Sequence, residues 1–212
     1  MSEIKVINAY KKYGSHTVLT DINLEFESGK IYGIIGRNGS GKTVLLKSIC
    51  GLIRLTSGEV HVNGKVVGKD IDFPEEIGLI IETPGFLMNY TGVKNLQLLA
   101  EIKGKITRSE IEESIKRVGL DPKLKKNVGT YSMGMKQRLG IAQAIMEKPD
   151  ILLLDEPMNG LDNDGVKEMR ELFTSLKEEG VLMLLCSHNP DDIKLLCDHV
   201  YEIDKGIINQ LY

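Results

Sequence analysis

The sequence predicts an α/β fold, because short apolar runs alternate with a helical pattern of apolar residues. The runs cover residues 31–35, 151–154 and 181–186. Strands of such composition belong in the middle of a parallel sheet that is covered on both faces. Between the last two runs, apolar residues recur at the three- and four-residue spacing of an amphipathic helix. These residues are Val166, Met169, Leu172, Phe173 and Leu176.

An antiparallel pair of strands is predicted ahead of this core. Ile4, Val6 and Ile7 form one strand-like segment, and residues 18–26 form a second. The pair leads through a short turn into the run at 31–35. We therefore expect an N-terminal antiparallel β subdomain beside the α/β core.

The middle of the chain has a different pattern, which predicts helices. Between about residues 86 and 130, apolar side chains are spaced by three and four positions, at Val93, Leu96, Leu99, Ile111, Ile115 and Val118. We predict an α-helical subdomain inserted at approximately 86–147. The whole sequence, 1–212, is expected to form a single domain, since this length suits one large α/β unit.

A phosphate-binding loop follows the first apolar run. Residues 36–43 read GRNGSGKT and match the P-loop spacing GxxxxGK[ST] between a strand and a helix. Backbone N–H groups of such a loop face one anion, and the following helix adds the positive end of its dipole. A chance glycine-rich loop is the alternative. The predicted nucleotide-binding residues are Arg37, Asn38, Gly39, Ser40, Gly41, Lys42 and Thr43.

Within this loop, two side chains have predicted roles. Lys42 is expected to contact the β- and γ-phosphates of a nucleoside triphosphate, and Thr43 to place its hydroxyl on Mg²⁺. The loop therefore predicts a nucleoside triphosphate as ligand and Mg²⁺ as cofactor.

Two adjacent carboxylates end the second apolar run, at Asp155 and Glu156. Successive side chains of a strand point in different directions, so the two can perform different tasks. We expect Asp155 to hold Mg²⁺ through its water shell and Glu156 to polarise the water that attacks the γ-phosphate. Capping of the next helix is the alternative explanation.

Composition limits the remaining classes of function. The formal net charge is −3, and the 27 Lys and Arg residues are interspersed with 30 Asp and Glu residues, so no nucleic acid is expected as a partner. No apolar run approaches the ~20 residues needed to cross a bilayer, and no signal peptide is recognisable. We expect a cytoplasmic protein. Its three cysteines, at positions 50, 186 and 197, are interpreted as reduced structural thiols.

Together with further motifs, the P-loop and the carboxylate pair give the chain a resemblance to the nucleotide-binding subunits of ATP-binding cassette (ABC) transporters. This resemblance covers nearly the whole length of the chain. Residues 131–139, YSMGMKQRL, occupy the place of the family signature LSGGQ just before the strand at 151–154. Asn159 to Asp162 resemble the D-loop, and Ser187 with His188 resemble the switch-histidine region.

The resemblance implies further site residues. Tyr13 is expected to stack on adenine, with Tyr10 as a weaker candidate. Ser132 and Gly134 of the signature would face the nucleotide held by the opposite protomer of a dimer. His188 would sense the γ-phosphate, and Asp162 would belong to the D-loop. In the family, this dimer closes over two ATP molecules and opens after hydrolysis.

Three features depart from the family pattern. Met133 and Met135 replace the first glycine and the glutamine of LSGGQ, and Asn159 replaces a D-loop serine. Glu82 stands where most relatives carry the Q-loop glutamine. A carboxylate there can still coordinate Mg²⁺, so Glu82 is predicted as a metal ligand and catalytic residue, but it cannot donate an amide hydrogen bond. Glu82 and the signature variant resemble the ATPases of bacterial exporters for bacitracin and lantibiotics.

The resemblance therefore implies an ATPase with ATP as substrate, acting as the motor subunit of a multi-subunit ABC transporter most similar to bacterial exporters. Expected partners are ATP, integral-membrane subunits, and a second ATPase subunit in a homodimer or heterodimer. The protein would lie on the inner face of the membrane through its membrane partner. A soluble ABC ATPase acting on a ribosome or DNA complex is the alternative, and a small-molecule P-loop kinase is a third possibility. The cargo is not encoded in this chain.

The resemblance also implies a contact surface for the membrane subunit. Phe86, Leu87 and Met88 follow the Q-loop residue Glu82 closely, and three large apolar side chains beside a bend suit a helix-in-groove contact. The alternative is that these side chains fill the core of the helical insert.

Overall fold

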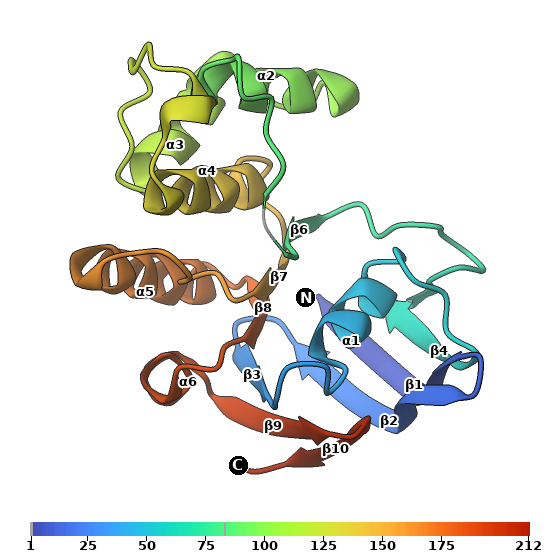
Figure 1. Ribbon diagram of the computed structural model, residues 1–212. Coiled ribbons are helices and arrows are strands. Elements are labelled where there is room, and N and C mark those ends of the chain that lie inside the picture. Colours follow the sequence, from blue (N-terminus) through green and yellow to red (C-terminus); the bar gives the residue numbers. More distant parts are fainter. Residues whose placement is uncertain (1, 83) are drawn as a thin grey trace.

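The chain is organised around two β-sheets with helices on either side (Figure 1). The computed structural model describes residues 2–82 and 84–212. A four-stranded sheet near the N-terminus and a six-stranded sheet share one layer of apolar packing. The helices α2, α3 and α4 form a separate group at the top of Figure 1.

The six-stranded sheet has the strand order β10-β9-β3-β8-β7-β6. Every neighbouring pair from β9 to β6 is parallel, and only β10 runs antiparallel at one edge. The strands are β3 (Ile31–Ile35), β6 (Ile77–Ile80), β7 (Ile151–Asp155), β8 (Leu182–Cys186), β9 (His199–Asp204) and β10 (Ile207–Gln210). The predicted α/β core is confirmed.

The central strands are buried on both faces, as their apolar composition predicts. All five residues of β7 and all five of β8 are buried. Along β7, Leu152 and Leu154 pack toward the helical group, whereas Ile151 and Leu153 pack toward the four-stranded sheet. This two-residue alternation ties both hydrophobic layers to one strand.

The four-stranded sheet has the order β2-β1-β4-β5 and is antiparallel. Its strands are β1 (Glu3–Tyr13), β2 (His16–Glu27), β4 (Ser57–Val62) and β5 (Lys65–Val66). Ile4 and Val6 are buried, but the neighbouring Ile7 is exposed, at an irregularity in the pairing of β1. The predicted N-terminal antiparallel subdomain is confirmed. Helix α1 (Lys42–Ile49) contributes Leu45, Leu46 and Ile49 to the packing between the two sheets.

The helical group lies between β6 and β7 in the sequence. It consists of α2 (Gly92–Lys103), α3 (Arg108–Arg117), the short 3₁₀ turn η1 (Val128–Thr130) and α4 (Met133–Ile145). Hydroxyl side chains cap the N-termini of α2, α3 and α4, namely Thr91, Thr107 and Ser132. The inserted α-helical subdomain is thus present, and the limits 86–147 remain a sequence-based prediction.

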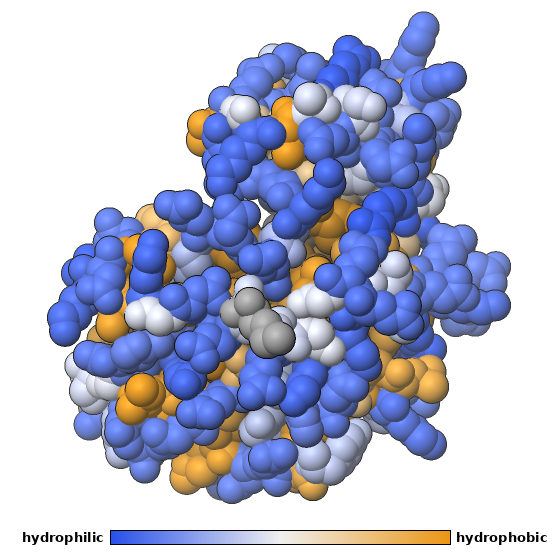
Figure 2. Space-filling model, turned by 180° about the vertical axis from the view of Figure 1, so that it is seen from behind, coloured by the Kyte–Doolittle hydropathy of each residue, from blue (hydrophilic) through white to orange (hydrophobic). Residues whose placement is uncertain are grey.

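Two further helices cover the core and carry the connections between its strands. Helix α5 (Asn163–Glu178) buries Met169, Leu172, Phe173 and Leu176 against the same layer as the helical group. Helix α6 (Pro190–Leu196) follows β8 directly. From behind, the molecule shows a mostly hydrophilic face with separate hydrophobic patches (Figure 2). Among the described residues, no helix is long and apolar enough to span a membrane.

Gly78 shows how closely helix α4 approaches the edge strand β6. A Cβ atom at this position would lie 2.1 Å from the Ala144 carbonyl oxygen and 2.7 Å from Leu152 Cδ2. Gly78→Ala is therefore expected to lower the free energy of unfolding by about 1–3 kcal/mol through overpacking. Urea denaturation would measure this loss. Gly85→Ala is the control, because a Cβ at Gly85 would meet no atom within 4 Å. Equal stability of the two variants would contradict the close approach.

Candidate functional site

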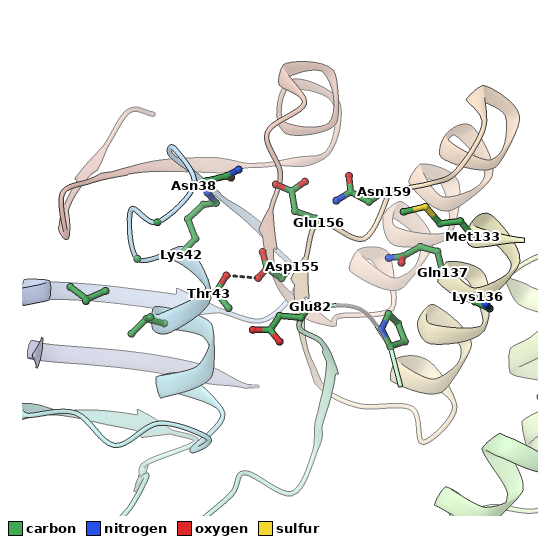
Figure 3. Close-up of a pocket in the computed structure, with 15 residues that line it drawn as sticks. Asn38, Lys42, Thr43, Glu82, Met133, Lys136, Gln137, Asp155, Glu156 and Asn159 are labelled. Carbon is green, nitrogen blue, oxygen red and sulfur yellow. Dashed lines mark hydrogen bonds between the residues drawn. The ribbon is translucent and has the colours of Figure 1, made fainter. Parts of the chain in front are cut away.

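The carboxyl ends of four parallel strands converge on one cleft (Figure 3). The P-loop follows β3, Asp155 ends β7, Ser187 and His188 follow β8, and Glu82 follows β6. Open parallel sheets place ligands at this edge, where successive loops leave the strands. The cleft has a volume of about 510 Å³ and is lined by Val18, Asn38, Gly39, Gly41, Lys42, Thr43, Val44, Glu82, Pro84, Met133, Lys136, Gln137, Asp155, Glu156 and Asn159.

The P-loop backbone has the curvature that an anion site requires. Gly36, Gly39 and Gly41 have φ values of 146°, 78° and 118°, which non-glycine residues rarely adopt. At Gly36, a Cβ would lie 2.2 Å from the Ile203 carbonyl oxygen. Helix α1 begins directly after Gly41, and no side chain caps its N-terminus. Its first N–H groups and the helix dipole therefore face the cleft as a site for negative charge.

Ser40 gives an independent indication that the loop is built for a polar ligand. Within the described residues, its buried Oγ atom has no hydrogen-bond partner. Buried polar atoms nearly always have a partner, because leaving one unpaired costs about 1–3 kcal/mol. A phosphate oxygen in the loop would be a suitable partner for this hydroxyl. Arg37 is exposed and, like Ser40, does not line the cleft itself.

The ammonium group of Lys42 lies inside the P-loop. Its Nζ donates to the carbonyl oxygens of Gly36 at 2.6 Å and Arg37 at 3.1 Å. The side chain is only 7% exposed, so these carbonyl contacts offset the cost of burying a charge. An ammonium has three donors. It can thus contact a phosphate oxygen while the loop holds it in place.

Thr43 and Asp155 form an oxygen-rich pair next to Lys42. Thr43 Oγ1 donates to Asp155 Oδ2 at 2.6 Å, as Figure 3 shows. Asp155 is the last residue of β7 and is buried. A hydroxyl and a carboxylate are the hard oxygen ligands that Mg²⁺ prefers. The donor atoms present therefore fit a magnesium ion coordinated also by phosphate and water.

Glu156 and His188 meet across the ends of β7 and β8. His188 Nδ1 lies 2.8 Å from Glu156 Oε2. Because a carboxylate accepts hydrogen bonds, a neutral His188 in this contact carries its proton on Nδ1 and leaves Nε2 as an acceptor. Glu156 has φ 52°, a left-handed backbone that is costly for a non-glycine residue, and its N–H donates to the Cys186 carbonyl at 2.9 Å. This geometry aims the carboxylate into the cleft (Figure 3).

Glu82 lines the cleft but pairs with a lysine of helix α1. Lys47 Nζ donates to Glu82 Oε1 at 2.6 Å. Glu82 also has a left-handed backbone, with φ 64°. Lys47 lies one helical turn beyond Thr43, so it compensates the extra negative charge of Glu82 beside the metal-binding pair. The metal role of Glu82 remains a prediction.

Several predicted residues lie outside this cleft. Tyr13 is exposed near the β1–β2 turn, where the ammonium of Lys11 lies 4.6 Å from its ring centroid. Ser132 caps helix α4 and accepts a hydrogen bond from the Met135 N–H, while Gly134 occupies the first turn of the same helix. Neither residue lines the cleft.

Asp162 likewise has a structural role in this chain. Its Oδ1 accepts from the Gly165 N–H at 2.9 Å and caps helix α5. Gly160 and Gly134 lie close together, since a Cβ at Gly134 would be 2.9 Å from the Gly160 carbonyl oxygen. The D-loop segment therefore packs against the start of helix α4.

Some cleft residues are missing from the sequence-based prediction. Lys136 and Gln137 reach the cleft from the first two turns of α4, and the buried Gln137 side chain donates to the Pro157 carbonyl at 2.9 Å. Val18 reaches it from β2. Only the helical spacing of Lys136 and Gln137 from Met133 could have indicated a shared face.

A buried thiol lies directly behind the two carboxylates. Cys186 pairs with Asp155 across β7 and β8. Burial raises the pKa of the Cys186 thiol well above its ordinary value, and the nearby negative charge of Asp155 raises it further. Burial also raises the pKa of Cys197, to about 12. Both thiols are therefore neutral packing groups, and neither is a nucleophile.

Comparison with known proteins places this geometry in a family. The family described as "ABC transporter" matches residues 19–159, which include the P-loop, the signature region and the Asp155–Glu156 pair. The ATP-binding protein YybJ of Bacillus subtilis (strain 168), an uncharacterized ABC transporter protein, is 46% identical over 203 residues, covering 96% of this chain and 93% of YybJ. The bacitracin transport ATP-binding protein BcrA of Bacillus licheniformis is 43% identical, covering 96% of this chain and 67% of BcrA.

A solved structure shares the architecture. The dimeric, post-hydrolysis form of the ATP-binding cassette MJ0796, bound to ADP and Pi, aligns with a TM-score of 0.87 and covers 99% of both chains. At 23% identity this likeness concerns the fold alone. The resemblance predicted from the sequence motifs is confirmed: the chain belongs to the ABC transporter family, as an ATP-binding, ATP-hydrolysing subunit.

Proposed function

We propose that this chain is the motor subunit of a bacterial exporter for a peptide antibiotic of the bacitracin kind, acting with separate membrane subunits. Its 43% identity to the bacitracin transport protein BcrA supports the substrate class. The motor function is supported by the cleft in which the P-loop, Asp155 and Glu156 meet, with His188 in contact with Glu156. No comparison favours action on a ribosome or DNA complex.

Nucleotide binding would rest on the P-loop and helix α1. The β- and γ-phosphates of ATP would accept hydrogen bonds from the first N–H groups of α1, from Ser40 Oγ and from Lys42 Nζ. Asn38 and Gly39 line the mouth of the loop. Thr43 and Asp155 would hold Mg²⁺, which when bound neutralises phosphate charge. Tyr13 would stack on adenine from the β1–β2 turn.

Hydrolysis would use the pair formed by Glu156 and His188. The Glu156 carboxylate lines the cleft and can accept a proton from, and orient, a water molecule near the γ-phosphate. Because Nδ1 contacts Glu156, the Nε2 atom of His188 stays free. Once Nε2 is protonated, it can contact that water or a phosphate oxygen. In this role His188 orients the base and senses the γ-phosphate.

A second ATPase subunit would complete each nucleotide site. Ser132 Oγ accepts from Met135 N–H, so its hydroxyl hydrogen remains able to donate to an anion. Ser132 and Gly134 lie at the N-terminus of α4, where the helix dipole attracts negative charge. These groups lie outside the cleft of their own chain. They would therefore serve a nucleotide bound by the opposite subunit, in a homodimer or a heterodimer.

The segment after the Q-loop has the properties of a docking surface for the membrane subunit. Leu87 and Met88 are 53% and 48% exposed, whereas Phe86 packs against the core. The buried Asn95 side chain holds the Leu87 backbone, accepting from its N–H at 2.7 Å and donating to its carbonyl at 3.1 Å. Exposed apolar groups on a fixed backbone suit an apolar helix of a partner. Through this contact with the membrane subunit, the ATPase subunit would lie at the inner face of the membrane.

Glu156→Gln is expected to lower the ATP hydrolysis rate by at least about 100-fold, because the amide cannot accept the proton of water. ATP binding should persist, so that MgATP converts the variant into dimers detectable by gel filtration. Lys42→Ala is the matched comparison and should weaken ATP binding itself. A Glu156→Gln variant that hydrolyses ATP at the parent rate would contradict the assignment.

Glu82→Gln is expected to change the transport-linked ATPase rate more than the basal rate, while ATP affinity changes less than about fivefold, since the Glu82 side chain is largely exposed. Rates would be measured with and without the membrane partner. Lys47→Met is the control that removes the same ion pair but keeps the Glu82 carboxylate. Identical rates for the parent and both variants would reduce Glu82 to an ordinary loop residue.

Met88→Asp is expected to reduce assembly with the membrane subunit by about tenfold, because a charge would enter an apolar contact. Co-purification would measure assembly, and unchanged ATP binding would show that the subunit is folded. Leu195→Asp, at an exposed apolar residue of α6, is the control. Equal assembly of the two variants would exclude this docking surface, and loss of folding in Met88→Asp would favour a core role.

A further inference from the structure

A buried ion pair lies beneath the loop that carries His188. Arg170 of helix α5 donates through Nε at 2.9 Å and through Nη2 at 2.5 Å to Asp192 Oδ1 on helix α6. Asp192 is only 1% exposed. A carboxylate this deeply buried requires charged or hydrogen-bonding partners, because desolvation otherwise costs several kcal/mol. The guanidinium of Arg170 is therefore the counter-charge of the Asp192 carboxylate.

The second oxygen of Asp192 contacts Ser187, the residue that precedes His188. Ser187 Oγ donates to Asp192 Oδ2 at 3.2 Å. The same Ser187 oxygen accepts from the Asn189 N–H at 3.1 Å. Ser187 is buried at the end of β8, and the Asn189 side chain caps helix α6. The Asp192 carboxylate thus holds Ser187, and the Ser187 hydroxyl in turn holds the backbone on the other side of His188.

His188 itself depends on this turn for its position. Its side chain is 69% exposed. Within the described structure, its ring contacts Glu156 Oε2. An exposed imidazole has many accessible rotamers and gains little from packing. The backbone at 187–189 therefore decides whether Nδ1 reaches the Glu156 carboxylate.

We propose that Arg170 is a positioning residue for ATP hydrolysis, which holds His188 against Glu156 through Asp192 and Ser187. This inference rests on the proposed role of Glu156 and His188 as the hydrolytic pair. Arg170 does not line the nucleotide cleft. Its effect on turnover is expected to act through the geometry of the His188 turn, without a contact to the nucleotide.

The guanidinium group is required because both of its contacts define the orientation of Asp192. Two N–H groups of Arg170 donate to one carboxylate oxygen, leaving the other oxygen for Ser187. A lysine would keep the counter-charge but supply a flexible, single-point contact. Arg170→Lys should therefore retain folding and lose part of the positioning.

Turnover kinetics provide the first test. Arg170→Met is expected to lower kcat for ATP roughly 10- to 100-fold, the loss typical of a displaced catalytic group, with little change in KM. Arg170→Lys should lie between the parent and Arg170→Met. Lys177→Met is the matched control, because it removes another ion pair of α5, Lys177 Nζ to Asp198 Oδ1 at 2.7 Å, away from His188. An equal loss of kcat in Lys177→Met would overturn the proposal.

The tautomer of His188 provides a readout that mere destabilisation would not move. In the parent, the ¹⁵N spectrum of the His188 ring should show a protonated Nδ1, since that atom faces the Glu156 carboxylate. Among the signals of the four histidines, the one that is absent from the spectrum of His188→Gln belongs to His188. Arg170→Met is expected to shift it toward an Nε2-protonated population, whereas Lys177→Met should leave it unchanged.

A double variant without either charge is the control for folding. Arg170→Met leaves Asp192 buried without its counter-charge, so the double variant Arg170→Met with Asp192→Asn is measured beside it. Its amide oxygen can still accept from Ser187, but the link to α5 is lost. The double variant is expected to fold and to keep a reduced kcat and a shifted tautomer. A folded double variant with parental kcat and parental tautomer would overturn the positioning role.

Different results would refute the hydrolytic pair and the positioning role of Arg170. Parental hydrolysis in Glu156→Gln would refute the hydrolytic pair, whatever the state of His188. Parental kcat with an unchanged His188 spectrum in folded Arg170 variants would refute the positioning role alone. The tautomer measurement needs neither nucleotide nor membrane partner.

Discussion

The common edge formed by the parallel strands is the constraint on which the rest of the site depends. Strand β8 pairs with β3 on one side and β7 on the other, and Cys186 is opposite both Ile34 and Asp155. The loops that follow these strands therefore leave the sheet side by side. Because β7 and β8 are buried on both faces, a one-residue slip would exchange the residues of the two hydrophobic layers. The register is thereby fixed, and with it the positions of the P-loop, Asp155 and His188.

Every charged group of the cleft that the mechanism uses has a partner within the chain. Lys42 contacts P-loop carbonyls, Asp155 accepts from Thr43, and Glu156 contacts His188. Such pairing offsets the cost of removing charges from water. The third donor of Lys42 remains for a phosphate oxygen while the loop carbonyls hold the ammonium. These contacts therefore keep the charged groups at fixed positions before a nucleotide arrives.

The signature helix and the D-loop are joined by close packing, and this packing explains one departure from the family pattern. Met133 replaces a signature glycine and is exposed at the start of α4. Its side chain lies against Gly160, where a Cβ would be 2.6 Å from Met133 Cγ. Gly160 has φ 78° and no side chain, so the larger Met133 is accommodated. The larger side chain of Met133 on α4 is therefore matched by the absence of a side chain at Gly160 of the D-loop.

The sequence by itself determined the fold class and the loop that we propose as the phosphate site. Apolar runs without polar positions specify strands covered on both faces, and the glycine spacing of 36–43 specifies a loop whose backbone can surround an anion. These are local properties, since each depends on neighbouring residues in one segment. The P-loop, Asp155 and Glu156 could be placed from them because each lies at the end of a recognisable strand or directly after it.

Only the tertiary structure decided which of these residues meet. The contact of Glu156 with His188 joins residues 32 positions apart, and the Arg170–Asp192 pair joins two helices separated by β8. No local pattern encodes them, because they depend on strand order and on the packing of α5 against α6. The same applies to Lys47, whose pairing with Glu82 follows from the position of β6 relative to α1. The sequence specified the chemical groups, whereas the burial of the sheet on both faces fixed the distances between them.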